Sequence, residues 1–188
     1  MAKHKKPIDS SPSKLLAKYA EEIAYNSNGP IIDVPCGYGR NAAYIASFGV
    51  PVLCIDINDD ALEFIKTGIN LTIAKLKDPN LLNTLKLDLI NDPWPFKDES
   101  IGAIINVHFF NPRVMEFFVN SLKIGGYLLI ETIDGRGGNY LELPTYGFIK
   151  SNLMDAFDFR YFIEKQVGPL FNIASTVKAL AIKRKAKI

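Results

Sequence analysis

The stretch that decides the fold is Ile31-Ile32-Asp33-Val34-Pro35-Cys36-Gly37-Tyr38-Gly39-Arg40-Asn41-Ala42-Ala43, followed shortly by Val52-Leu53-Cys54-Ile55-Asp56. An apolar β-branched run leads through a glycine-bearing turn into a helix-like segment, and a second apolar strand then ends in an acid. This order is typical of a doubly wound sheet that builds a nucleotide-sized site at the carboxyl ends of its first two strands. Gly37 and Gly39 let the backbone pass close to a ligand. Asp56, 19 positions after Gly37, can accept hydrogen bonds from both hydroxyls of a ribose. The stretch therefore predicts a cofactor site.

The overall composition is that of one globular domain. The chain has 188 residues, of which 48% are hydrophobic and 22% charged, and its formal net charge is +2. So small a charge does not by itself argue for a nucleic-acid partner. The basic residues near both ends are interpreted as solubilising tails, with a weak footprint for an anionic partner as the alternative. We expect residues 1–10 to be a disordered basic tail and residues 11–188 to form a single domain.

Neither a membrane segment nor a metal site is indicated. The longest uncharged apolar runs have strand length, well short of the roughly 20 residues that a spanning helix needs, and the basic N-terminus lacks the apolar core of a signal peptide. The only cysteines, Cys36 and Cys54, lie in or beside expected strands without metal-ligand spacing. Buried free thiols suit a reducing compartment, so the sequence predicts a cytoplasmic protein.

Apolar spacing and turn residues place the remaining elements. Strands are expected at 31–34, 52–56, 84–89, 101–107 and 127–133, and helices between them begin near Tyr38, Asn58 or Asp59, and Asn111-Pro112. A first helix is expected to open at Ser11-Pro12, with the proline in its first turn, and the helix after Asn58 is expected to end or bend between residues 68 and 80. This alternation requires a parallel sheet with right-handed crossovers.

The pattern changes after the fifth expected strand. A glycine-rich loop at 134–146 and a short helix at 148–156 precede two strands, 159–167 and 173–183, which are joined around Gly168-Pro169. So short a link cannot be a parallel crossover, so these strands form an antiparallel hairpin. The hairpin leaves no residues for a substrate domain. Together with Asp33 inside the first strand and Asp88 at the end of the third, it argues against a nicotinamide-dependent dehydrogenase.

Together these features resemble a class I S-adenosylmethionine-dependent methyltransferase over roughly residues 12–185. The block Cys36-Gly37-Tyr38-Gly39-Arg40-Asn41 more closely resembles the small bacterial methyltransferases of the tellurite-resistance type. The resemblance implies an α/β fold with a doubly wound, mostly parallel seven-stranded sheet and an antiparallel C-terminal hairpin, and it implies S-adenosylmethionine as the cofactor. Pro35 departs from the family, which usually has its first glycine there. Because proline fixes φ and lacks an N–H, the methionine end of the cofactor would be held slightly differently.

Position by position, the resemblance assigns contacts to the ribose and methionine ends of the cofactor. Asp33 would organise the amino group, directly or through water. Gly37 and Gly39 would make room for the carboxylate and sulfonium portion. Asp56 would bind the ribose hydroxyls, and Ile57 would pack on the adenine.

The other assignments lie at the ends of the third and fourth strands. Asp88 would hold the adenine amino group with Leu89 beside it, and Asn106 and Val107 would line the methyl-donor side. Two alternatives stay open, namely that Asp33 caps the turn and that Asp88 is a solvated strand end.

His108, just past the fourth strand, is the candidate catalytic residue. It could act as a general base for an N–H or O–H acceptor, or its ring could hydrogen-bond a backbone carbonyl. Phe109 and Phe110 could wall the acceptor pocket or pack in the core. Four residues of the glycine-rich loop follow the fifth strand, where they could contact the substrate or simply be solvated at the surface: Asp134, Arg136, Tyr140 and Glu142.

The acceptor is expected to be a small molecule rather than RNA or protein. The segment Asn106-Val107-His108-Phe109 lacks the Asn/Asp-Pro-Pro-Tyr/Phe motif of amino-methylating DNA enzymes. Methyl transfer needs mainly alignment of the nucleophile and exclusion of water, so no metal cluster or triad is required. Two other functions stay open: a non-catalytic S-adenosylmethionine-binding module and a nicotinamide-dependent oxidoreductase. The segment through Tyr25 and the 134–146 loop are expected to close over the cofactor.

Overall fold

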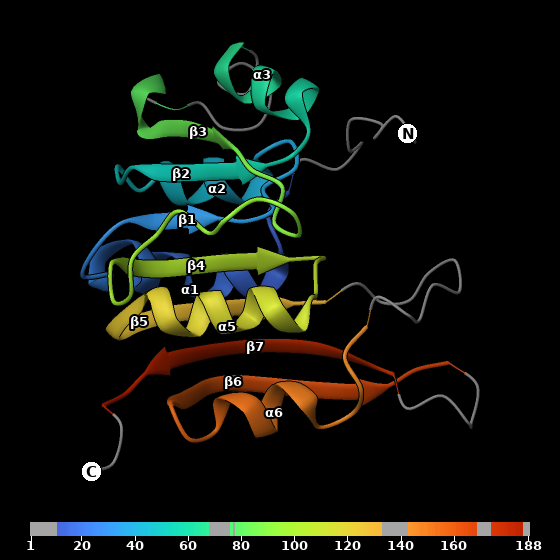
Figure 1. Cartoon of the computed structure of the whole chain (residues 1–188). Helices are drawn as coiled ribbons and strands as arrows, with labels where there is room; N and C mark the ends of the chain where they lie inside the picture. The colour runs from blue at the N-terminus through green and yellow to red at the C-terminus, as the bar shows by residue number, and fades with distance from the viewer. Residues whose placement is uncertain (1–10, 68–75, 77, 133–142, 169–173, 186–188) are drawn as a thin grey trace.

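One mixed sheet of seven strands forms the centre of the molecule. The computed structural model describes residues 11–67, 76, 78–132, 143–168 and 174–185. The strands lie in the order β3-β2-β1-β4-β5-β7-β6 (Figure 1). Their bounds are Ile31–Asp33 (β1), Val52–Asp56 (β2), Leu82–Lys86 (β3), Ile101–Val107 (β4), Leu122–Glu131 (β5), Phe157–Gln166 (β6) and Ser175–Lys183 (β7).

The direction of the strands confirms the expected fold class. Strands β1 to β5 pair with one another in parallel, whereas β7 pairs antiparallel with both β5 and β6. The C-terminal hairpin is therefore inserted so that its last strand lies inside the sheet. The order reverses between β1 and β4, and in an open α/β sheet this switch point is where ligands bind.

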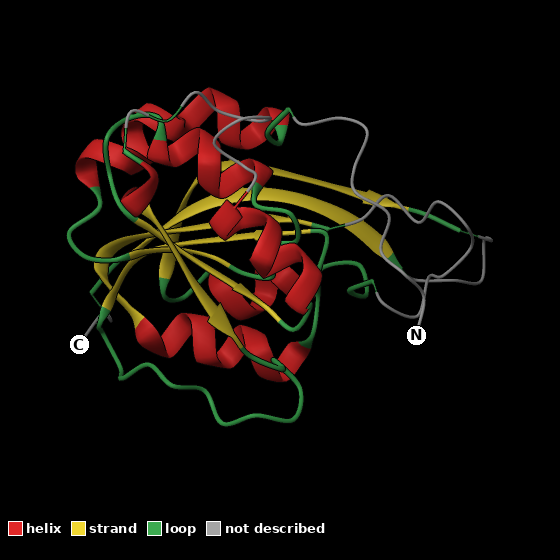
Figure 2. Cartoon of the chain, turned by 90° about the horizontal axis from the view of Figure 1, so that it is seen from above, coloured by secondary structure: helices red, strands yellow, loops and turns green. Residues whose placement is uncertain are grey.

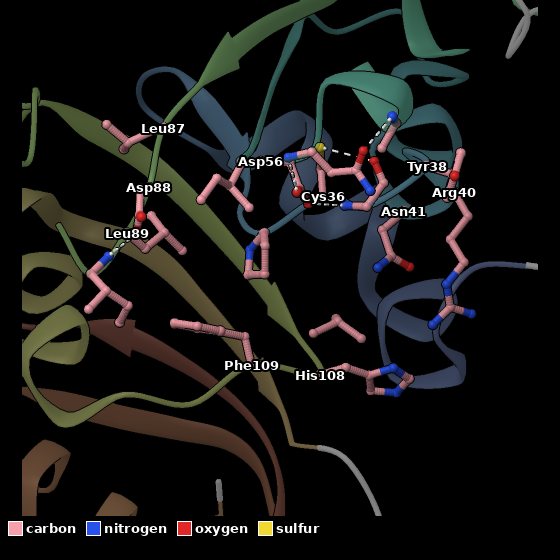
Figure 3. Close-up of a pocket in the computed structure, with 17 residues that line it drawn as sticks. Cys36, Tyr38, Arg40, Asn41, Asp56, Leu87, Asp88, Leu89, His108 and Phe109 are labelled. Atoms are coloured by element: carbon pink, nitrogen blue, oxygen red, sulfur yellow. Dashed lines mark hydrogen bonds between the residues drawn. The ribbon is translucent and has the colours of Figure 1, made fainter. Parts of the chain in front are cut away.

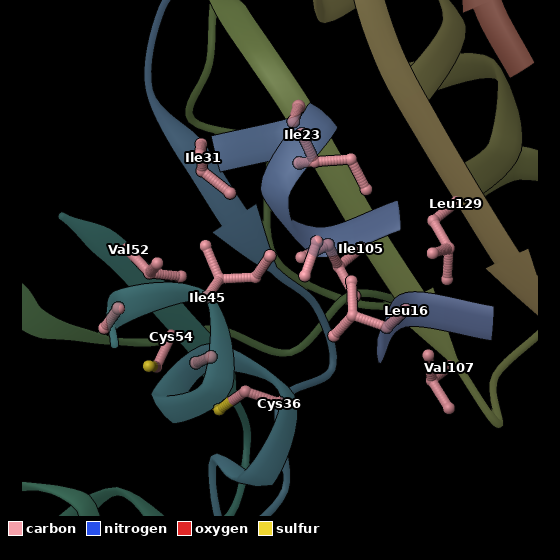
Figure 4. Close-up of a cluster of buried hydrophobic side chains, with 14 of the residues drawn as sticks. Leu16, Ile23, Ile31, Cys36, Ile45, Val52, Cys54, Ile105, Val107 and Leu129 are labelled. Carbon is pink, nitrogen blue, oxygen red and sulfur yellow. The ribbon is translucent and has the colours of Figure 1, made fainter. Parts of the chain in front are cut away.

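Helices cover both faces of the sheet and produce three layers (Figure 2). They are α1 (Lys14–Asn26), α2 (Arg40–Ala46), α3 (Asp59–Thr67), α5 (Pro112–Ser121) and α6 (Phe148–Leu153), with a short 3₁₀ turn at Pro79–Leu81. Because strand side chains alternate, Ile31 packs with α1, α2 and α3 on one face, a cluster shown in Figure 4. Ile32 packs with α5 and α6 on the other. Cys36 and Cys54 are free and buried, as expected.

Helices α1, α3 and α5 each begin after a residue whose side chain accepts hydrogen bonds from the first backbone amides of the helix. Asn111 accepts hydrogen bonds from the amides of Arg113 and Val114 at 3.0 and 3.3 Å, which confirms the expected start of α5. Asn58, rather than Asp59, caps α3. The expected start of α1 is wrong, because the hydroxyl of Ser13 caps it by accepting from the amide of Leu16. A side-chain acceptor at this position outweighs proline as a start signal, and Pro12 lies before the cap.

Other boundaries differ by a few residues. Strand β4 has the expected bounds, and α2 begins at Arg40, two residues later than expected. Strand β3 ends at Lys86, so Asp88 lies in the turn after the strand instead of at its end. Strand β5 begins at Leu122, before its two glycines, and its pairing with β4 shifts register between Ile101 and Ala103.

Several expectations lie outside the described residues. These are the disordered tail at 1–10, the bend at 68–75, most of the glycine-rich loop, and residues 169–173 in the hairpin link. Within the described part of the chain, no helix is long and apolar enough to cross a membrane.

Candidate functional site

A cavity of about 620 Å³ opens at the carboxyl ends of β1, β2, β3 and β4 (Figure 3). Its volume lies in the range of small-molecule sites. Four chain segments line it, each at or just past the end of a strand: residues 35–38 with 40–41, residues 56–58 with Ala61, residues 87–90, and residues 107–109. The cavity therefore sits at the switch point of the sheet, where the glycine-bearing stretch predicts a cofactor.

Asp56 is fixed by the backbone of the loop that faces it. Its Oδ2 accepts a hydrogen bond from the amide of Gly37 at 2.7 Å, and its Oδ1 accepts from the amide of Asn58 at 2.9 Å. Each carboxylate oxygen has a second lone-pair site, so both can still accept from a ligand. Gly37 has a φ of 52°, in the left-handed region, and a Cβ added there would meet no atom within 4 Å. Open space thus lies directly over the loop.

Asp33 lies fully buried behind this loop and does not line the cavity. Its Oδ2 accepts from the amide of Ala42, in the first turn of α2, at 3.0 Å, although the residue at the N-cap of this helix is Gly39. Burial raises the pKa of Asp33 to about 7, and the charge of Asp56 adds to the rise, although the Ala42 amide and the charge of Arg40 oppose it. Its Oδ1 has no hydrogen-bond partner among the described residues. A buried, unpaired carboxyl oxygen fits a ligand that brings a donor or a positive charge.

The cavity wall on both sides of Asp88 is apolar and consists of Leu87, Leu89 and Ile90. Ile57 and Ile90 leave 55% and 58% of their surfaces exposed, which suits a flat aromatic ring. The carboxylate of Asp88 accepts from the side chain of Asn91 at 2.8 Å and from the amide of Ile90 at 2.9 Å. The Asn91 side chain, followed by the Ile90 amide, holds the pKa of Asp88 below its ordinary value. Asp88 therefore closes its own turn while it lines the cavity.

The end of β4 supplies the third wall. Val107, His108 and Phe109 line the cavity. His108 has a φ of 66°, unusual for a residue other than glycine, and its amide donates to the carbonyl oxygen of Glu131 at 2.6 Å. Asn106 instead points behind the cavity, where its Nδ2 donates to the carbonyl oxygen of Val34 at 2.8 Å. Its role at the methyl-donor side stays a prediction, as does that of His108 as a general base.

The two phenylalanines after His108 differ in position. Phe109 lines the cavity, whereas Phe110 is absent from its lining and packs edge-to-face on Phe148, with ring centroids 5.4 Å apart. For Phe110 the structure thus favours core packing. The four loop residues considered as substrate contacts lie outside the described residues. Among the described residues, no group of three His, Cys, Asp or Glu side chains could hold a metal ion.

Most of the predicted cofactor residues are brought together by the fold. Seven of them line the cavity beside His108: Pro35, Gly37, Asp56, Ile57, Asp88, Leu89 and Val107. Asp33, Gly39 and Asn106 do not line it. Sequence reasoning missed eight lining residues: Cys36, Tyr38, Arg40, Asn41, Asn58, Ala61, Leu87 and Ile90. The first four stand inside the stretch that it quoted, but their side-chain directions are set by the turn and not by any pattern.

Comparisons with known proteins identify the family and support the fold. The family profile described as "Methyltransferase domain" matches residues 32–130, which is 99 of 188 residues. No curated protein matches the chain in sequence. The structure of MccD protein is similar with a TM-score of 0.66 at 15% identity, over 94% of this chain and 100% of that one.

Two further solved structures are similar at the level of the fold. One is a SAM-dependent methyltransferase from Methanosarcina mazei, with a TM-score of 0.63 and 18% identity over 93% of this chain and 99% of that one. The other is TehB from Haemophilus influenzae, with a TM-score of 0.60 and 18% identity over 89% of this chain and 62% of that one.

Proposed function

This chain belongs to the methyltransferase-domain family of class I S-adenosylmethionine-dependent enzymes, and on that premise we propose that it transfers a methyl group from S-adenosylmethionine to a small-molecule acceptor. The observation that carries the proposal is the cavity at the switch point, in which the Asp56 carboxylate stands fixed beside the open Gly37 turn. Because the chain belongs to this family, we do not propose the nicotinamide-dependent oxidoreductase activity that the glycine pattern left open.

The residues present fit the cofactor. We assign the ribose hydroxyls to Asp56, whose two oxygens keep free acceptor sites, and the adenine to the exposed faces of Ile57 and Ile90. The positively charged methionine end would lie over Gly37, toward the unpaired Oδ1 of Asp33. Asp88 and Leu89 would border the adenine. The remaining residues of the proposed cofactor site are Pro35, Gly39, Asn106 and Val107.

Bound there, S-adenosylmethionine supplies a methyl group already activated on a sulfonium. The protein then has to align the acceptor and exclude water. Val107 and Phe109 provide apolar walls for this, and the ring of His108 stands at the same end of the cavity to take a proton from an N–H or O–H acceptor.

The segment Asn106-Val107-His108-Phe109 lacks the Asn/Asp-Pro-Pro-Tyr/Phe motif of amino-methylating DNA enzymes, and this supports a small-molecule acceptor. The resemblance of residues 36–41 to the tellurite-resistance type belongs to the same proposal. The free, buried Cys36 and Cys54 support a reducing, cytoplasmic location. We also propose that residues 11–188 act as a single domain.

The proposal is tested by calorimetry on the full chain. We expect one site that binds S-adenosylmethionine and S-adenosylhomocysteine in competition with each other. Incubation with S-adenosylmethionine and a panel of amine, hydroxyl and thiol compounds should then release S-adenosylhomocysteine above background. Tight binding of NADH with no response to S-adenosylmethionine would contradict the proposal. Binding without turnover across the panel would favour the non-catalytic module.

A further inference from the structure

The carboxylate of Glu131, the last residue of β5, joins three elements behind the rim of the cavity. The residue is only 6% exposed. Its Oε1 accepts from the Lys178 ammonium of β7 at 2.5 Å, and its Oε2 accepts from the hydroxyl of Ser13, the cap of α1. Burial opposes ionisation, but the hydrogen bonds from Lys178 and Ser13, with the charges of Lys178 and His108, hold the pKa of Glu131 below its ordinary value. Glu131 is therefore an ion at neutral pH, and no step of methyl transfer described so far uses it.

The segment that this carboxylate holds is also hydrogen-bonded to two residues that line the cavity. The amide of Ser13 donates to the Oδ1 of Asn41 at 2.9 Å, and the Nη1 of Arg40 donates to the carbonyl oxygen of Ser11 at 2.8 Å. Asn41 and Arg40 both line the cavity. Figure 3 shows them on the same side of it as His108. The short segment 11–13 is thus held both by the carboxylate of Glu131 and by the side chains of Arg40 and Asn41, the first two residues of α2.

Glu131 also fixes the backbone of His108. Its carbonyl oxygen accepts from the His108 amide at 2.6 Å and so helps to hold His108 in its left-handed conformation. A positive charge on His108 would lower the pKa of the Glu131 carboxyl further, after the larger effects of Lys178 and Ser13. Glu131 therefore contacts the start of α1 through its side chain and the candidate general base through its main-chain carbonyl, and only the first contact depends on the carboxylate.

We infer that Glu131 is a positioning residue for methyl transfer, holding segment 11–13 and His108 together at the rim of the cofactor cavity. The inference rests on the proposed function, because it concerns the same cavity. Replacing the carboxylate by an amide removes the charge that Lys178 and His108 face and weakens the acceptor for Ser13. Segment 11–13 then loosens, and with it the ordered positions of Asn41 and Arg40 at the cavity wall.

Glu131→Gln in the full chain tests this, with Glu164→Gln as the matched control. Glu164 also accepts from a serine hydroxyl, that of Ser175 at 2.7 Å, and from the Gly147 amide at 2.9 Å, but it does not line the cavity or contact its lining residues in these bonds. Both variants should lose thermal stability. Only Glu131→Gln should weaken binding of S-adenosylhomocysteine, by about fivefold or more, as is typical of coupled sites.

Two readouts separate positioning from a purely structural role. The C2–H proton resonance of His108 should titrate with a lower midpoint in Glu131→Gln than in the wild type, because the nearby anion is gone while Lys178 remains. Hydrogen exchange of peptides covering residues 11–20 should become faster. Glu164→Gln should change neither. A folded Glu131→Gln protein with wild-type affinity and an unchanged His108 midpoint would overturn the inference.

A second variant covers the case in which Glu131→Gln does not fold. Ser13→Ala keeps the Glu131–Lys178 pair and should cost about 1 kcal/mol of stability through the lost cap. It should speed exchange in residues 11–20 and weaken S-adenosylhomocysteine binding, and unchanged affinity in this variant would overturn the inference. Failure of the wild-type chain to bind S-adenosylhomocysteine would contradict the proposed function. The His108 titration would still decide whether the charge of Glu131 acts on His108.

Discussion

Replacing Asp33 by asparagine is expected to stabilise the ligand-free protein at pH 8 and to leave its stability nearly unchanged at pH 4. Burial raises the pKa of Asp33 to about 7 from 3.8, and a difference of about 3 pKa units corresponds to roughly 4 kcal/mol. Asparagine has nearly the shape of the protonated acid. Its Oδ1 can accept from the Ala42 amide as the Asp33 Oδ2 does, and it carries no charge that burial could penalise.

The sign follows from proton binding in the two states. Below about pH 4 the Asp33 carboxyl is protonated in both the folded and the unfolded protein, so it contributes no pH dependence. Between about pH 4 and pH 7 the folded protein binds the proton that the unfolded chain has lost, so wild-type stability falls as pH rises. Above about pH 7 the penalty is complete, and the gain from Asp33→Asn is greatest.

Urea unfolding of both proteins at several pH values between 4 and 8.5 measures this difference directly. The matched control is Asp98→Asn, which removes the same charge from an exposed position and should shift stability by less than about 0.5 kcal/mol. A difference between Asp33→Asn and the wild type that stays flat with pH would contradict the prediction. Asp33→Asn should also bind S-adenosylmethionine more weakly, because the buried negative charge that destabilises the empty protein would face the positive end of the cofactor.

The fold could be predicted from the sequence because its signals are local. Strand β4 has the expected bounds since Ile101 to Val107 is a mostly apolar run between turn residues, and α5 begins where Asn111 can cap it. The antiparallel hairpin followed from the shortness of its link, and β6 and β7 confirm it. The errors lie where local signals compete. Strand β3 stops at Lys86 because the carboxylate of Asp88 closes a turn on Ile90 and Asn91.

The parts of the site that sequence reasoning missed depend on contacts between distant residues. Ser13 and Glu131 are 118 positions apart, and Ser13 and Asn41 are 28 apart. No spacing rule connects such pairs, and the burial of Glu131 depends on β7 entering the sheet between β5 and β6. The carboxyl ends of the strands could be anticipated as the place of the site. Which polar side chains meet there, and which remain unpaired, is decided by packing.

Asp56→Ala is expected to weaken binding of S-adenosylhomocysteine about 10- to 100-fold, the equivalent of about 1.5–3 kcal/mol. The carboxylate would lose its charge-assisted bonds to the ribose, and the Gly37 amide, which donates to it at 2.7 Å, would lose its partner. The neighbouring Asp59, which pairs with Lys86 outside the cavity lining, supplies the control Asp59→Ala, and calorimetry should show its affinity unchanged.

The 2′,3′-dideoxy analogue of S-adenosylhomocysteine separates the loss of the ribose bonds from the loss of the Gly37 partner in a double-mutant cycle. If Asp56 binds the hydroxyls, the effect of Asp56→Ala shrinks for the analogue to the part that comes from Gly37. An equal loss for both ligands would show that Asp56 only shapes the loop, and the ribose would then have to be held by another residue of the cavity.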